Sequence, residues 1–402
     1  MRDLSGVQPH IGLNLIFLVP GETGGMEIAA RELIPALLDE APAGMRFTAF
    51  INREAAAAGG PWEGVLPAVT VPVNARSRVQ WVLGEQALLP RLAANAGVDL
   101  VHSLASTAPL RGRFRRVVTI HDLIYARFPE AHSRLRELGM GVLVPRAARH
   151  SDRVIADSQS TRNDLMELLG IAARRIDVVP LGLGSVQRAA PLAPGETRAR
   201  FDLGERRLVL CLSAKRPHKN LLALIDALAL IPSQDRPVLV LPGYPTPHEV
   251  ELRERAQALR VERDVRFPAW VSAEELEGLW ALARAFVFPS LYEGFGLPVL
   301  EAMARGVPVA CSNTSSLPEV AGDAALLFDP LRRSDIAAAL ARLLDDQRLR
   351  ERLSTLGRAR AELFTWQRAA RLTLQSYTRT LGLHGASNAF ESEGARGAPP
   401  VV

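Results

Sequence analysis

The sequence contains few cysteines and few aromatic residues. Its 402 residues include 2 Cys, and aromatic residues make up 5% of the chain. Cys211 and Cys311 each lie in an apolar run that predicts a buried strand, which favours two free thiols over a disulfide framework or a zinc site. Proteins that bind single-stranded nucleic acid interleave aromatic and basic side chains, and no such cluster occurs. We therefore expect no nucleic-acid partner.

A long hydrophobic run is missing near the N-terminus. The longest apolar stretch there, Ile11–Val19, has about nine residues with Asn14 inside it, whereas a bilayer-spanning helix needs about 20. Gln8, Pro9 and His10 interrupt the signal-like start, and no convincing small-residue cleavage site follows. We therefore expect a cytoplasmic protein.

Charge is spread evenly, although the net charge is +5, with Lys+Arg 48 against Asp+Glu 43. Residues 1–185 carry 20 Arg against 18 acidic residues, and the remainder carry 28 basic residues against 25, so neither half is a basic arm. One local cluster consists of Arg111, Arg113, Arg115 and Arg116. It is compatible with a solvated turn or with peripheral contact with anionic lipid at the inner face of a membrane.

Ligands for a divalent metal are also scarce. The sequence has no Asp-x-Asp pair, and Asp345-Asp346 lies in a late helical segment away from the other motifs. Because divalent cations that bind phosphates prefer carboxylate ligands, we expect no metal and no other cofactor.

Short apolar runs alternate with helical periodicity, which predicts an α/β protein with parallel sheets covered on both faces. The strands expected in the first half are Ile11–Val19, Phe47–Ile51, Val69–Val73, Leu100–His102, Val117–Ile120, Val154–Ala156 and Ile176–Val179. The periodicity stops at Gly184–Gly195 and restarts with strands at Leu208–Leu212, Val238–Leu241, Val265–Phe267, Phe286–Phe288 and Val307–Cys311.

We therefore predict two Rossmann-like, doubly wound domains that face a central cleft. The N-terminal domain is expected over residues 1–183, a linker over 184–200 and the C-terminal domain over 201–365. A helix over 366–384 is expected to pack back on the first domain. Residues 385–402 are rich in Gly, Ser, Ala and Pro, so we expect them to be disordered.

The segment Ser290–Ala304 carries the strongest functional signal. A strand ends near Pro289, a loop with Gly294 and Gly296 follows, and Pro298 stands where a helix would begin. A helix N-terminus favours phosphate, while Glu293 and Glu301 are suited to accept hydrogen bonds from hydroxyl groups. Phosphate together with hydroxyls indicates a sugar nucleotide.

These residues resemble the Glu-x7-Glu signature of glycosyltransferase family 4, whose members are retaining enzymes with the two-domain GT-B fold. The resemblance covers nearly the whole chain, and the family includes mannosyltransferase-like members. It implies that Glu293 contacts hydroxyls of the donor sugar and Glu301 the ribose. The backbone of Gly294, Phe295, Gly296 and Leu297 would hold the sugar and the diphosphate.

A cationic loop opens the second domain. The only two lysines of the protein, Lys215 and Lys219, lie in it with Arg216 between them. Fixed cations near a departing diphosphate stabilise the transition state. The resemblance implies this role for Lys219, with an arginine as its partner. Because the loop is short, the partner is either Arg216, which we prefer, or Lys215.

His121 follows the strand Val117–Ile120, and Asp122 comes next. The resemblance implies that His121 contacts the donor sugar. His102 ends another strand and is a weaker candidate for the same cleft. Gly24 and Gly25 form a loop that the resemblance associates with acceptor and diphosphate binding, and their spacing differs from a dinucleotide-binding G-x-G-x-x-G.

Together these features indicate a retaining, metal-independent glycosyltransferase. It would move a hexose of mannose or glucose type from a nucleotide diphosphate sugar to a hydroxyl of a glycan or a lipid-linked sugar, in polysaccharide, lipopolysaccharide or glycolipid biosynthesis. The first domain would bind the acceptor and the second the donor. Two alternatives stay open at this point: a non-catalytic sugar-nucleotide-binding subunit on the same scaffold, and a sugar-nucleotide epimerase.

Overall fold

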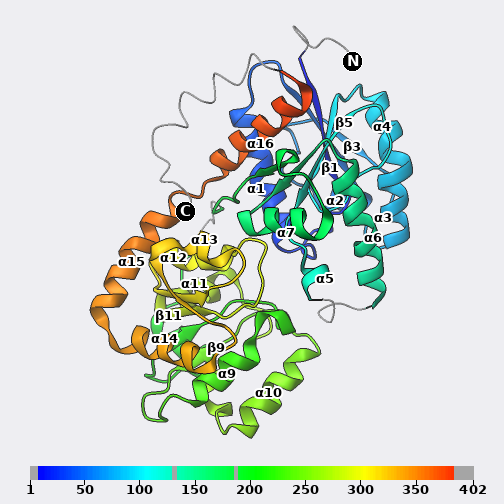
Figure 1. Cartoon of the computed structure of the whole chain (residues 1–402). Coiled ribbons are helices and arrows are strands. Elements are labelled where there is room, and N and C mark those ends of the chain that lie inside the picture. Colours follow the sequence, from blue (N-terminus) through cyan, green and yellow to red (C-terminus); the bar gives the residue numbers. More distant parts are fainter. Residues whose placement is uncertain (1–7, 129–133, 185–188, 384–402) are drawn as a thin grey trace. The chain divides into compact units, whose positions relative to one another are not determined.

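The computed structural model describes residues 8–128, 134–184 and 189–383, which divide into two units (Figure 1). The first unit comprises Met1–Gly184 together with Phe364–Val402, and the second comprises Ser185–Leu363. None of the described helices is long and apolar enough to cross a membrane.

The first unit contains a seven-stranded sheet in which every pairing is parallel, in the order β3-β2-β1-β4-β5-β6-β7. Its strands are β1 (His10–Leu15), β2 (Arg46–Ile51), β3 (Ala68–Thr70), β4 (Leu100–Ser103), β5 (Arg115–Ile120), β6 (Arg153–Ala156) and β7 (Ile176–Val178). Successive side chains of β2 alternate between two cores: Ala49 joins the core under α1, and Phe50 joins the core under α4. The sheet is therefore covered on both faces.

The covering helices are α1 (Gly25–Glu40), α2 (Arg53–Ala58), α3 (Arg78–Leu83), α4 (Leu89–Asn95), α5 (Ile124–Arg127), α6 (Arg134–His150), α7 (Gln159–Leu169) and α16 (Trp366–Leu381), with a π-helical turn at Gly84–Leu88. The last helix, α16, lies beside α1 although the two are more than 300 residues apart (Figure 1). The Tyr377 hydroxyl lies 2.7 Å from His102 Nδ1, and both residues are fully buried. This polar contact fixes α16 over the sheet.

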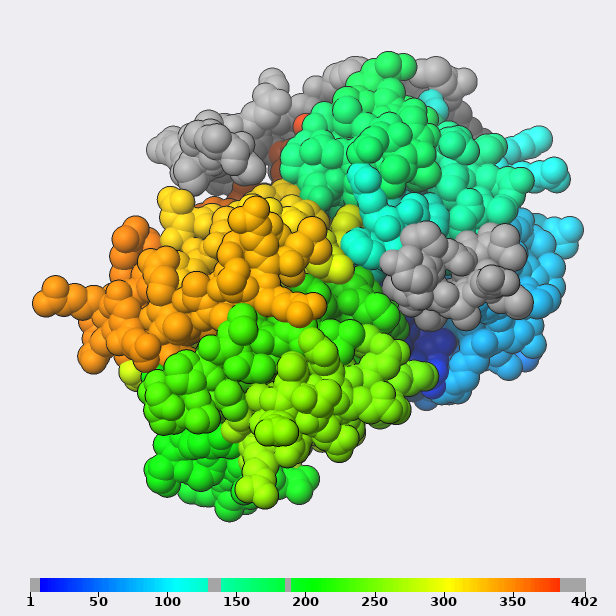
Figure 2. All heavy atoms as spheres, turned by 60° about the horizontal axis from the view of Figure 1, so that its bottom comes forward, coloured from blue at the N-terminus to red at the C-terminus, as the bar shows by residue number. Residues whose placement is uncertain are grey.

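The second unit contains a six-stranded parallel sheet in the order β10-β9-β8-β11-β12-β13. Its strands are β8 (Leu208–Leu210), β9 (Val238–Val240), β10 (Val265–Arg266), β11 (Ala283–Phe288), β12 (Val309–Ser312) and β13 (Ala325–Phe328). Its helices are α8 (Pro194–Arg200), α9 (Leu221–Ala229), α10 (His248–Ala258), α11 (Ala273–Leu282), α12 (Leu297–Ala304), α13 (Leu317–Ala321), α14 (Arg333–Asp345) and α15 (Gln347–Ala361). Figure 2 shows the surface that the green and lime segments around α9 and α10 form in this unit.

Several sequence-based boundaries and elements differ from the structure. The strand expected over Ile11–Val19 ends at Leu15, because the chain turns there and Leu18 donates its N–H to the Leu15 carbonyl. The segment 184–200, expected as a linker, contains α8, which begins with Pro194 in its first turn and buries Thr197 against Gly278. Strand β13 was not expected; its apolar run, Ala325–Phe328, is four residues long and lies between helical segments, where a run this short does not distinguish a strand from a helix. The tail expected over 385–402 lies outside the described residues.

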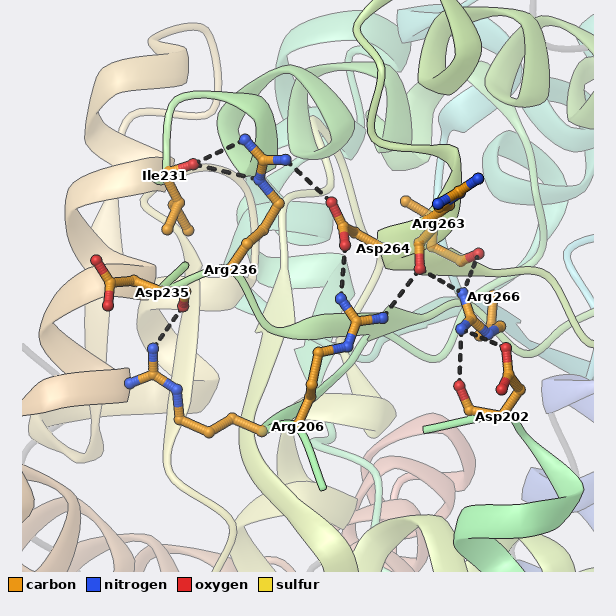
Figure 3. Close-up of polar contacts among 10 residues, drawn as sticks. Asp202, Arg206, Ile231, Asp235, Arg236, Arg263, Asp264 and Arg266 are labelled. Atoms are coloured by element: carbon orange, nitrogen blue, oxygen red, sulfur yellow. Dashed lines mark hydrogen bonds and ion pairs between the residues drawn. The ribbon is translucent and has the colours of Figure 1, made fainter. Parts of the chain in front are cut away.

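A network of ionic contacts surrounds the starts of β8, β9 and β10 (Figure 3). Asp264 accepts hydrogen bonds from Arg206 Nη1 at 2.6 Å and from Arg236 Nη1 at 3.0 Å. The two guanidinium groups also donate to the carbonyls of Arg263 and Ile231. One carboxylate thus links the segments before three neighbouring strands.

We expect Asp264→Ala to lower the free energy of unfolding by about 2 kcal/mol, since it leaves the partly buried Arg236 guanidinium short of an acceptor. Chemical denaturation measures this change. Asp235→Ala is the matched control because only the Asp235 backbone carbonyl takes part in the network, where it accepts from Arg207. An equal loss in both variants would contradict the assigned role of Asp264.

Candidate active site

In the second unit, the loops after β8 and β11 are joined directly. The Leu291 N–H donates to the His218 carbonyl at 2.8 Å. Ser316 Oγ donates to the carbonyls of Glu293 and Phe295, and the Glu293 N–H donates to Ser315 Oγ. Since β8 and β11 are neighbouring parallel strands, both loops lie at the carboxyl edge of the sheet. The loop that contains Glu293 is thus held through its backbone groups by the side chains of Ser315 and Ser316, which follow β12.

The second loop leads into α12 with the geometry that its sequence predicts. Gly296 is the N-cap residue with φ of 115°, a conformation that favours glycine, and a Cβ there would lie 2.8 Å from the Leu317 side chain. Pro298 lies in the first turn of the helix. Pro298 has no N–H and the Val299 N–H donates to the Gly296 carbonyl at 3.0 Å, so it is the partial positive charge of this helix N-terminus that suits it to an anionic group.

Lys219 and Glu293 form an ion pair across the two loops. Lys219 Nζ lies 2.5 Å from Glu293 Oε1, and the side chains are 17% and 13% exposed. The ammonium also lies 5.5 Å from the centre of the Phe288 ring. Asn220, with φ of 57°, fixes the backbone beside Lys219 by donating from Nδ2 to the carbonyls of Pro289 and Pro330. The structure therefore brings together two residues that the sequence analysis assigned to one site.

Glu301 lies in the second turn of α12, where burial raises the pKa of its carboxyl group. The nearby Arg305 opposes this rise, but its guanidinium is engaged by Glu277. A half-buried carboxyl group of this kind is suited to hydrogen bonds with neutral hydroxyl groups.

In the first unit, His121 follows β5 directly. Its Nδ1 lies 2.6 Å from Asp157 Oδ2, and its Nε2 lies 2.9 Å from the Leu104 carbonyl oxygen. Burial opposes a charge on the ring, but the Asp157 carboxylate outweighs it and raises the pKa of His121 to about 9. A cavity of about 20 Å³, large enough for one water molecule, adjoins both side chains.

His102 has a structural role. It is fully buried, and its two ring nitrogens contact the hydroxyls of Tyr377 and Thr119 at 2.7 and 2.8 Å. Burial lowers the pKa of His102 to about 3, so the ring is neutral. The expectation that His102 could line the cleft is not supported, because its side chain is fully buried.

Gly24 and Gly25 lie where the first strand's loop meets α1. Gly24 is the N-cap residue of this 16-residue helix with φ of 62°, and Gly25 is its first residue. A Cβ at either position would meet nothing within 4 Å. The two glycines therefore leave the N-terminus of α1 sterically open.

Comparison with known proteins identifies the family. A family model described as Glycosyltransferase Family 4 matches residues 23–183, and one described as Glycosyl transferases group 1 matches residues 196–360. The O-antigen chain mannosyltransferase B of Escherichia coli is 34% identical over 268 residues, which cover 65% of this chain and 70% of that protein. The chain belongs to glycosyltransferase family 4.

Other relatives agree with this assignment. The GDP-mannose-dependent alpha-(1-6)-phosphatidylinositol monomannoside mannosyltransferase of Mycobacterium tuberculosis is 33% identical, over 66% of this chain and 68% of that protein. The serotype-specific mannosyltransferase WbdA of Escherichia coli is 31% identical over 70% of this chain, but over only 35% of its own length.

The solved structures confirm the fold. The sucrose-phosphate synthase of Thermosynechococcus elongatus superposes with a TM-score of 0.71 at 22% identity, over 93% of this chain and all of that chain. HepE of Anabaena, solved with UDP and glucose, gives 0.71 at 20% identity over 92% of this chain. The prediction of two Rossmann-like α/β domains of the GT-B type is confirmed.

Lys215, one of the two candidates for the partner of Lys219 in this glycosyltransferase, is fully buried. Its Nζ donates to the Gly243 carbonyl at 2.7 Å and lies 3.3 Å from Glu249 Oε2. The Arg216 side chain is half-buried, and within the described ranges no residue accepts a hydrogen bond from its guanidinium. Of the two candidates, only Arg216 has a charge available to a ligand.

An aromatic pair that was not expected from the sequence lies beside this loop. Tyr244 and Trp270 follow β9 and β10, their ring centres are 5.5 Å apart, and they are 52% and 72% exposed. Lys215 joins their loops, because it donates to Gly243, next to Tyr244, and at 3.4 Å to Pro268, two residues before Trp270. The signal that could have revealed the pair is two large aromatic residues in the loops that follow neighbouring strands of one sheet.

We expect the two lysines to respond differently to removal of the charge. Lys215→Met should lower the free energy of unfolding by about 3 kcal/mol, because it leaves Glu249 and the Gly243 carbonyl without their buried partner. Lys219→Met is the matched control at the edge of the site and should cost less than half as much. Denaturant titration of both variants measures the difference, and a Lys215→Met protein as stable as the wild type would contradict the structural role.

Proposed function

We propose that this glycosyltransferase transfers mannose from GDP-mannose to a hydroxyl group of a glycan or lipid-linked acceptor. The ion pair of Lys219 with Glu293 at the carboxyl edge of the second sheet carries the proposal, because it combines a cation for phosphate with an acceptor for sugar hydroxyls. Mannose is supported by the names of the three relatives described above, all of which are mannosyltransferases and one of which names GDP-mannose. A UDP-linked hexose is the competing donor.

Each of the candidate residues would contact a different part of the donor. Lys219 and Arg216 would face the diphosphate, which gains negative charge as the glycosidic bond breaks. Glu293 would accept hydrogen bonds from hydroxyls of the sugar, and Glu301 from those of the ribose. The backbone from Gly294 to Leu297 would cradle the sugar and the phosphates. Because side chains and a helix N-terminus supply the positive charge, we propose that transfer needs no metal.

Retention of configuration would follow if the acceptor attacks on the face from which the diphosphate leaves. The acceptor oxygen forms the new bond to the anomeric carbon, the bond to the phosphate oxygen breaks, and that phosphate oxygen takes the acceptor proton. Atoms and charge balance without a covalent enzyme intermediate.

The acceptor would bind to the first unit and belong to cell-envelope polysaccharide, lipopolysaccharide or glycolipid synthesis. In the arginine cluster that could contact a membrane, two of the four side chains are engaged by other residues of the first unit. Arg115 pairs with Asp152 at 2.7 Å, and Arg116 donates to the Pro109 carbonyl and stacks on Phe114. Arg111 and Arg113 stay exposed for such a contact.

We expect one nucleoside diphosphate among GDP, UDP and ADP to raise the melting temperature in the presence of EDTA, and we expect it to be GDP. At 100 times its dissociation constant a ligand adds about 2.7 kcal/mol to the unfolding free energy. Lys219→Ala should lose this shift, whereas Arg348→Ala, an exposed change on α15, should keep it. A shift that survives in Lys219→Ala would remove the diphosphate site from this loop.

We expect mannosyl transfer from GDP-mannose to fall about 100-fold or more in Lys219→Ala, because the leaving group loses a fixed cation. NMR of the product should show the anomeric configuration of the donor, and EDTA should leave the rate unchanged. Inversion would refute the retaining mechanism, and rate loss in EDTA with recovery on adding Mg²⁺ would refute metal independence. Isomerisation of the donor without any acceptor would instead identify an epimerase.

A further inference from the structure

The hydrogen-bond partners of His121 determine its protonation state. Nε2 lies 2.9 Å from the Leu104 carbonyl oxygen, which can only accept, so Nε2 carries a hydrogen. Nδ1 lies 2.6 Å from Asp157 Oδ2. An ionised carboxylate also only accepts, so Nδ1 carries a second hydrogen. The pair is then an imidazolium and a carboxylate, both largely shielded from water at 15% and 3% exposure.

The charged groups around the ring support the cation. Asp157 faces it from the end of β6, and Asp122 adds a second negative charge from the segment after β5. His102 faces it from β4 and is neutral, since burial and the charge of His121 both lower the pKa of His102. No second positive charge therefore competes with the ring among these neighbours.

The local chain holds both residues in place. His121 and Asp157 directly follow β5 and β6, which pair in parallel with Ile120 opposite Ala156. The next residue, Ser158, caps α7 by accepting the Thr161 N–H, and the Thr161 hydroxyl donates to the His121 carbonyl at 3.3 Å. The contact between ring and carboxylate is thus a consequence of strand register and needs no substrate to form.

We infer that Asp157 is a positioning residue that keeps His121 as an imidazolium, so that His121 serves the transfer reaction as a fixed cation and hydrogen-bond donor and not as a general base. This inference rests on the proposed function for the role of His121 as a substrate contact. A substrate oxygen would take the Nε2–H in place of the Leu104 carbonyl, and no proton would leave the ring. The acceptor proton goes to the departing phosphate, which is consistent with a histidine that stays charged.

The test combines ring protonation with a pH profile. In protein labelled with ¹⁵N in histidine rings, the signals of His121, assigned by their loss in His121→Gln, should show two N–H groups from pH 6 to 8. In Asp157→Asn the ring should lose one proton at or below its ordinary pKa of 6.5 instead of at about 9, because burial then opposes the charge without the carboxylate. The alkaline limit of kcat/KM for mannosyl transfer should move down by the same interval.

Asp122→Asn is the matched control, because its carboxylate accepts the Ile124 N–H and does not contact the ring. Its alkaline limit should stay within half a pH unit of the wild type. The inference is overturned if the wild-type ring is neutral at pH 7, or if kcat/KM rises as the ring loses its proton. Should Asp157→Asn fail to fold, the wild-type ring signals decide alone. An imidazolium in a protein that transfers no sugar would refute the proposed function and leave the Asp157–His121 pair intact.

Discussion

Every described strand pairing in both sheets is parallel, and this constraint determines where chemistry can occur in each unit. In a parallel sheet all strands end at the same edge, so loops that are far apart in sequence meet there. Lys219 and Glu293 are 74 residues apart and form an ion pair because β8 and β11 are neighbours. The opposite edge of the same sheet carries the network of Asp264 with its arginines, which has no part in the site. The Asp264 network and the proposed site are thus separated by the length of the strands.

The two lysines show how burial decides the role of a charge. They lie four residues apart in one loop, yet Lys215 is fully buried and Lys219 lies at the edge of the site. The flexible stem of Lys215 lets one compact ammonium reach carbonyls in the loops after β9 and β10. A planar guanidinium would need more space and more acceptors in the same position. Of the two lysines in this arginine-rich chain, one therefore meets a structural requirement and the other a proposed functional one. The sequence alone does not show which lysine has which role.

The sequence predicts this fold well where strands are buried on both faces, because such strands are continuous apolar runs. It fails at β13, a run of four apolar residues between helical segments, and at α8, which is short and polar and was taken as part of a linker. The loop before α12 is predicted correctly because glycine and proline favour particular backbone conformations at a helix start, and Gly296 and Pro298 occupy such positions. The contact of His121 with Asp157, and the burial of Lys215, depend on strand order and register, which no local pattern encodes.

In each unit a carboxylate holds the cation that the proposed mechanism uses: Glu293 holds Lys219, and Asp157 holds His121. Without these partners each cation would be partly desolvated and uncompensated, at a cost of several kcal/mol by general estimates. The two pairs differ in what a ligand can do to them. Glu293 is 13% exposed, so on the proposed function a phosphate could take over Lys219 while the freed carboxylate accepts sugar hydroxyls. Asp157 is 3% exposed, so on the proposed mechanism a substrate would not displace it and the charge of His121 would stay constant while the substrate binds.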